Sequence, residues 1–333
     1  MLRRLGMTLA TTGAAVAVAA AAVPSTAFAW GGGGAGGGDQ NVGTKGQNIT
    51  VTVTGTGVKP GGGKVTVPAS TVSVPPPCWM EPGMTGKQYN DFVRGTGDYS
   101  GRGLNYLNKH MGENEKPQPG QADHATDDKG QWWSATCDSG NFPGSIQDFF
   151  AFSDKFFAAN PTRFIPFNQP KPVPPVPPEF LREIAIKQLK IPDPKINWNP
   201  KRTGDASTLV NIDTWFWLDN SPESMSVTAT AGNNSATVQA DLVGLQVSGP
   251  GLPTTTCTGA GVPYAQGATG ACTAAFRSSS DGLPGRVTPV TVQTTWTATW
   301  SANGAPRGPI AQPPAPASGT TNIAVREVQS VTR

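Results

Sequence analysis

The sequence predicts an α+β N-terminal region followed by an all-β sandwich. From residue 209 onward, segments of alternating apolar and polar residues are separated by turns rich in Gly and Pro, which is the pattern of antiparallel strands. Apolar residues at helical spacing occur upstream, in residues 84–93, 144–159 and 178–189. We therefore expect helices and some strands first, and strands alone afterwards.

The C-terminal strands are expected at residues 209–218, 225–231, 236–247, 272–278, 287–301 and 320–331. Alternation is most regular in 287–301. One face of this segment carries Val290, Val292, Thr294, Trp296, Ala298 and Trp300, and the other carries Thr291, Gln293, Thr295, Thr297 and Thr299. Such alternation favours an antiparallel sheet with one buried and one solvated face. Six strands of this kind indicate an immunoglobulin-like sandwich over residues 201–333.

Residues 47–165 are expected to form the α+β region. It begins with two alternating segments, 47–56 and 64–74, that predict a hairpin with a long loop. In the predicted helix 144–159, one face carries apolar residues that we expect in the core: Ile146, Phe149, Phe150, Phe156 and Phe157. Residues 166–200 form a Pro-rich connector, with a helix over 178–189 that begins at Pro178.

Residues 1–29 predict a signal peptide. A basic start with Arg3 and Arg4 precedes an uncharged apolar stretch, and Ala27-Phe28-Ala29 supplies the small-x-small pattern of a cleavage site. The apolar stretch is short and Ala-rich for a bilayer span of about 20 residues. Residues 30–46 follow as a Gly-rich tether. We expect a secreted, extracellular protein with no integral membrane segment after cleavage; both release and association with the cell wall stay open.

The charge balance argues against nucleic acid as a partner. The 25 Lys and Arg residues include the two arginines of the leader, so the remaining 23 nearly balance the 22 Asp and Glu residues. Phosphate binding requires a concentrated excess of basic side chains. With 41 Gly, 32 Pro and 14% charged residues, the composition favours strands and ordered loops.

Four cysteines in an exported chain predict two disulfides. Three connectivities are possible. Cys78 and Cys137 lie before the Pro-rich connector, and Cys257 and Cys272 lie after it. This separation favours the pairs Cys78–Cys137 and Cys257–Cys272, which makes 47–165 a disulfide-stapled region.

Several segments resemble a group of secreted actinobacterial proteins of unknown function. The matching segments are Pro76-Pro77-Cys78-Trp79, residues 189–192, 209–218 and 257–264, and the strand around Trp296 and Trp300. The resemblance implies a PKD-type immunoglobulin-like domain at the C-terminal end. In place of the family's Trp-x-x-Gly-Asp-Gly turn, residues 245–251 lack the Trp and the Asp. Members are often labelled nucleotide-binding, but Gly61-Gly62-Gly63-Lys64 lacks the first glycine and the hydroxyl residue of a phosphate-binding loop.

No residues form a recognisable catalytic cluster, cofactor site or metal site. The chain has two histidines, His110 and His124. Carboxylates and one imidazole can together hold a cation, and this segment contains such side chains: His124, Asp127, Asp128, Glu113 and Glu115. Their spacing along the chain matches no known ligand pattern. We expect this segment to be a solvated loop, and the protein not to be an enzyme.

Tryptophans are the candidate ligand contacts. Trp132 and Trp133 lie in a polar segment near Cys137 and are the better candidates for an exposed aromatic contact, although burial in the core is the alternative. Trp198, Trp215 and Trp217 invite the same interpretation, but a strand apolar on both faces is more often buried, so we expect them in the core.

These observations favour an exported, non-catalytic interaction or scaffold protein of the cell envelope or extracellular space. Its partner would be an unknown protein or a cell-wall polymer. One alternative is a polysaccharide- or peptidoglycan-binding module with exposed Trp rings. The other is an uncharacterised hydrolase in the N-terminal half, with a histidine buried beside acids.

Overall fold

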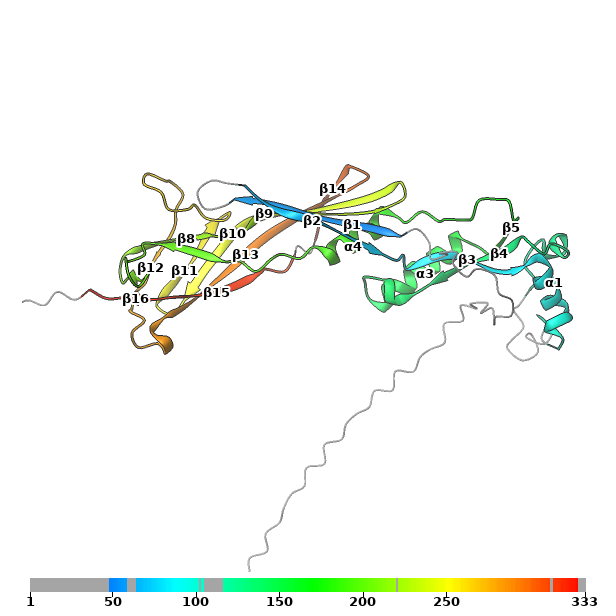
Figure 1. Cartoon of the computed structure of the whole chain (residues 1–333), viewed down its shortest axis with the longest axis horizontal. Helices are drawn as coiled ribbons and strands as arrows, with labels where there is room; N and C mark the ends of the chain where they lie inside the picture. The colour runs from blue at the N-terminus through cyan, green and yellow to red at the C-terminus, as the bar shows by residue number, and fades with distance from the viewer. Residues whose placement is uncertain are drawn as a thin grey trace, which may run out of the picture.

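The computed structural model describes residues 48–58, 64–101, 103–104, 116–219, 221–311 and 314–328. The predicted signal peptide, the predicted tether, and His110, Glu113 and Glu115 lie outside these residues. Figure 1 shows an elongated molecule, with α1 (Gly86–Arg94) near one end and β16 (Val325–Arg326) near the other. No helix in the described ranges is long and apolar enough to cross a membrane.

A large antiparallel sheet dominates the fold. Its strands follow the order β14 (Ala305–Pro309), β13 (Thr288–Ala302), β10 (Asn234–Gly249), β9 (Pro222–Ala231), β1 (Ile49–Val58) and β2 (Lys64–Val74). In addition, β11 (Leu252–Thr258) pairs with β10, and β15 (Ser318–Ile323) pairs with β13. The predicted strands 225–231, 236–247 and 287–301 are therefore confirmed as β9, β10 and β13, whereas β11 and β14 arise in segments where no strand was expected.

The N-terminal hairpin belongs to this large sheet. Strand β1 pairs antiparallel with β9, with Thr52 opposite Thr228. We had expected the hairpin to lie with the α+β region of 47–165, on the other side of the Pro-rich connector. The pairing has a physical reason: the apolar residues of β1, Ile49 and Val51, are buried in the same core as Val227 of β9.

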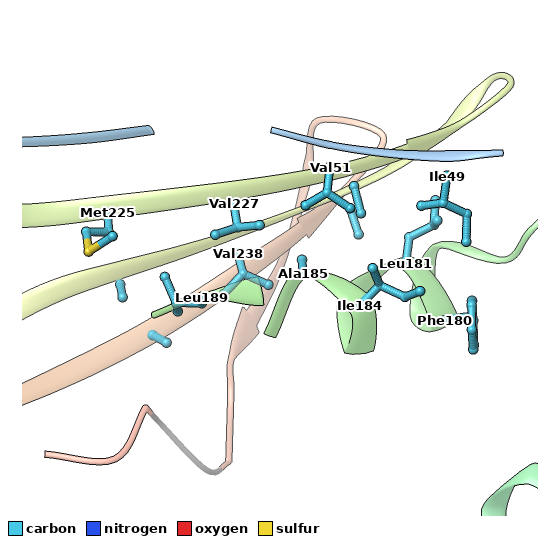
Figure 2. Packing of buried hydrophobic residues seen from close by; sticks show 14 of the residues in the cluster. Ile49, Val51, Phe180, Leu181, Ile184, Ala185, Leu189, Met225, Val227 and Val238 are labelled. Atoms are coloured by element: carbon cyan, nitrogen blue, oxygen red, sulfur yellow. The ribbon is translucent and has the colours of Figure 1, made fainter. Parts of the chain in front are cut away.

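The inner face of the large sheet is covered at one end by α4 (Pro178–Gln188). Proline at the first turn, with its φ already helical, starts this helix as predicted. Leu181, Ile184 and Ala185 point from α4 toward the sheet, where they meet Val227 and Val238 (Figure 2). The inner face of β13 is buried as predicted, and Thr295, Thr297 and Thr299 are exposed on the opposite side.

A second, smaller sheet covers the other end of the same face. It consists of β12 (Cys272–Ala275), β8 (Asp213–Leu218) and β6 (Ile196–Asn199). Phe216 and Leu218 of β8 pack against Val247 and Val292 of the large sheet. The Cys257–Cys272 disulfide joins β11 of one layer to β12 of the other. At the edge, β16 pairs parallel with β7 (Thr208–Leu209).

A third sheet lies in the N-terminal half of the described chain, in the order β3 (Cys78–Thr85), β4 (Gln131–Cys137) and β5 (Arg163–Ile165). The disulfide between Cys78 and Cys137, directly opposite residues of β3 and β4, confirms the second predicted pairing. A capping box between Thr85 and Gln88 starts α1. Short 3₁₀ turns are η1 (Gly97–Tyr99), η2 (Gln121–His124), η3 (Ser139–Asn141) and, further along the chain, η4 (Pro284–Arg286).

Helix α3 (Ile146–Ala159) corrects one part of the predicted core. Phe149 is buried, and Phe152 lies against Phe180 of α4 with ring centroids 5.0 Å apart. Ile146 and Phe150, however, are 49% and 47% exposed. The buried stripe is therefore narrower than the run of Phe residues implied: Phe149 and Ser153 are its buried residues, and α3 contacts β4.

Candidate functional site

Trp132 and Trp133 lie in β4, and both are buried. Their exposed fractions are 5% and 4%, so the prediction of an exposed aromatic pair in a polar loop is wrong. The segment is instead the middle strand of the β3–β4–β5 sheet, and successive side chains of a strand point to opposite faces. Each indole is therefore covered on its own side of the sheet.

Trp132 belongs to an aromatic cluster between β4 and α1. Its ring centroid lies 5.3 Å from that of Tyr89 in α1 and 5.5 Å from that of Phe164 in β5. His124 stacks on Phe164 with centroids 3.7 Å apart and an interplanar angle of 15°. These contacts, together with Phe92 and Leu104, form the small core of the N-terminal part.

A small pocket opens beside Trp132. Its lining residues come from β3, α1, β4 and two loops: Gly83, Met84, Tyr89, Gln118, Trp132, Ser134 and Thr162. The lining atoms bound about 260 Å³ of empty space, part of it open to solvent. The Gln118 backbone N–H donates to Tyr89 Oη at 3.1 Å, and the Ser134 and Thr162 hydroxyls lie 3.2 Å apart. The buried Trp132 Nε1 has no hydrogen-bond partner among the described residues.

The candidate cation ligands named from the sequence do not come together as a metal site in the described part of the chain. The His124 ring is stacked on Phe164 in the aromatic cluster. The Asp127 carboxylate accepts backbone hydrogen bonds from Gly130 at 2.8 Å and Lys129 at 2.9 Å. These two bonds hold the pKa of Asp127 below its ordinary value. Within the described ranges, no three His, Cys, Asp or Glu side chains gather as metal ligands.

A second aromatic surface lies on the outer face of the smaller sheet. The loop closed by Cys257–Cys272 folds back over β8, and the Leu218 backbone N–H donates to the Ala260 carbonyl at 2.7 Å. Gly261, with φ +72°, permits this approach, because a Cβ there would lie 2.7 Å from the Phe216 carbonyl oxygen. Trp217 is covered, as expected of a core residue.

Trp215 remains half-buried on this surface, and Tyr264 of the loop is 52% exposed. The two rings meet edge to face, with centroids 5.2 Å apart. Sequence reasoning did not single out Tyr264; its place in a short disulfide-closed loop was the available signal.

The outer face of the large sheet presents rows of uncharged polar side chains, which we call the hydroxyl face. One row crosses five strands and consists of Thr71, Thr52, Thr228, Thr237 and Ser301. A neighbouring row consists of Thr54, Ser226, Gln239 and Thr299. The Thr228 and Thr237 hydroxyls lie 2.9 Å apart. Each hydroxyl can both donate and accept a hydrogen bond.

Comparisons of the chain with protein-family models, with curated proteins and with solved structures return no match.

Proposed function

We propose that the chain is an exported, non-catalytic interaction protein of the cell envelope or extracellular space. The observation that carries this proposal is the hydroxyl face. This face is broad and regular, and its two rows contain no charged side chain. A broad surface of this kind suits contact with an extended partner, whereas catalysis relies on convergent groups in a concave site.

The two disulfides support the exported location, because such bonds persist in oxidising compartments.

The arrangement of the sheets supports an immunoglobulin-like or PKD-like assignment for the C-terminal part. In its favour are two facing layers and a disulfide that joins them. The long β1–β2 hairpin added to the sheet edge is an extension of that plan.

A polysaccharide-binding module is the second candidate, and the Trp215–Tyr264 surface favours it. Aromatic rings present apolar faces beside polar groups, and Asn199 lies directly opposite Trp215 in the sheet. The surface differs from the predicted Trp132–Trp133 pair in being partly open to solvent.

Binding of the purified protein to isolated cell envelope tests both candidates. Thr228→Lys combined with Thr71→Lys places two charges in one row of the hydroxyl face, and Gln147→Lys combined with Ala158→Lys, at exposed positions of α3, adds the same charge elsewhere as the matched control. We expect the hydroxyl-face variant to bind at least about tenfold more weakly, because a charge buried in an uncharged contact is desolvated without a partner. If the hydroxyl-face variant binds the envelope as strongly as the control variant and the wild type do, the role of the hydroxyl face is refuted.

Tyr264→Ala separates the second candidate from the first. Loss of binding in Tyr264→Ala, with the hydroxyl-face variant unaffected, would establish the aromatic surface as the contact. Competition by soluble envelope polysaccharide would then identify the partner as a sugar polymer, and release by protease treatment of the envelope would identify it as a protein.

A further inference from the structure

The pocket beside Trp132 combines apolar walls with an unsatisfied donor. None of its seven lining side chains carries a charge at neutral pH. Met84 and the rings of Tyr89 and Trp132 supply apolar surface. The Trp132 indole N–H is a donor without a partner among the described residues. A buried donor left unpaired is costly, so it favours any group that brings an acceptor oxygen.

The size of the pocket limits what enters it. Its interior admits one water-sized or methyl-sized group, and part of the space between the lining residues is open to solvent. The indole nitrogen itself is shielded by the surrounding side chains. A ligand reaches it when a neighbouring side chain moves slightly, and Met84 is the most adaptable neighbour, because its thioether chain has three rotatable bonds.

We propose that this pocket binds the acetamido group of an N-acetylated amino sugar. The methyl end occupies the apolar interior between Met84 and the aromatic rings, and the carbonyl oxygen accepts the Trp132 indole N–H. In this arrangement the sugar ring stays outside, on the side of the pocket that is open to solvent. A carboxylate or ammonium group fits poorly, because no lining side chain would compensate its charge. A sugar hydroxyl group in the same place also fits less well than an acetamido group, because it has no methyl group to contact the apolar walls.

This site is separate from the hydroxyl face and from the Trp215–Tyr264 surface, so it goes beyond the proposed function. The three surfaces come from different sheets. Failure of envelope binding by the hydroxyl-face variant therefore leaves the pocket proposal unaffected, and the reverse also holds.

Indole N–H signals of the ¹⁵N-labelled full chain test the proposal. The Trp132→Phe variant identifies the Trp132 signal by its disappearance, and Trp133→Phe is the matched control, because this neighbouring indole is equally buried and does not line the pocket. The probes are N-acetylglucosamine, free acetamide and, as the ligand without an acetamido group, glucose.

We expect N-acetylglucosamine and acetamide to shift the Trp132 signal and glucose to leave it in place. Affinity for N-acetylglucosamine should fall about tenfold in Trp132→Phe and stay unchanged in Trp133→Phe. No shift with either acetamido probe, or an equal shift with glucose, would overturn the proposal. If Trp132→Phe does not fold, the responding indole signal is assigned through other variants: a signal that responds to the acetamido probes but disappears in Trp133→Phe, or in Trp215→Phe on the other aromatic surface, would also overturn the proposal.

Discussion

Leu181→Ala is the sharpest test of how α4 holds the large sheet. Leu181 is fully buried (0% exposed) in the core that α4 shares with β1, β9 and β10. Truncation removes one methine and two methyl carbons and leaves a cavity that the strands on the facing side cannot readily fill. For buried Leu→Ala the loss is 2–5 kcal/mol, and we expect about 3 kcal/mol here because the site is closed on the sheet side but flanked by a single helix.

Urea unfolding of the oxidised protein, followed by far-ultraviolet circular dichroism, measures this loss as a lower midpoint at constant slope. Lys187→Ala on the same helix is the control, because Lys187 is exposed and Ala preserves helix propensity. A Leu181→Ala protein within about 0.5 kcal/mol of wild type would refute the packing argument. So would equal destabilisation by Lys187→Ala.

Other outcomes follow from the same structure. Replacing Cys78 and Cys137 by Ala opens a closed segment with a sequence separation of 59 residues, and we expect a loss of about 4 kcal/mol by chain-entropy reasoning, measured by urea unfolding; an unchanged midpoint would contradict it. The pKa of Asp281 lies below its ordinary value of 3.8, chiefly through its hydrogen bond from Arg286 and also through the charge of Arg326. Because folding lowers this pKa, its stabilising effect is complete above the unfolded-state pKa and is lost as the pH falls through the folded-state pKa. Asp281→Asn should therefore flatten the acid limb of the stability–pH curve below about pH 5 and leave the pH dependence near neutrality unchanged, and an identical acid limb in the variant would exclude this role.

Periodicity identified most elements of the large sheet and the three helices that the structure describes. The alternation in residues 287–301 was sufficient because one face is buried and the other is solvated over its whole length. Strand β3 was missed because Glu81, Pro82 and Gly83 interrupt any alternation. Strand β14 was missed because two prolines and a glycine in five residues suggest a loop; at a sheet edge, proline costs less.

The candidate sites were harder to infer than the fold. A pair of Trp residues in a polar stretch looks exposed, yet burial depends on what the tertiary structure places over each side of the strand. Trp132 is covered by α1 and β5, which come from opposite ends of the same region. Tyr264 became a candidate only through its contact with Trp215, 49 positions away in the chain and therefore invisible to local pattern.

The sequence by itself determined the local properties of this protein: the strand and helix periods, the start of α4 at Pro178 and the low share of charged residues. These depend on residues close in the chain or on counts over all of it. The tertiary structure alone decided that β1 pairs with β9 across the Pro-rich connector, and which indoles are buried. Both depend on which apolar faces meet, and a strand's own sequence specifies that it has such a face without specifying the partner that covers it.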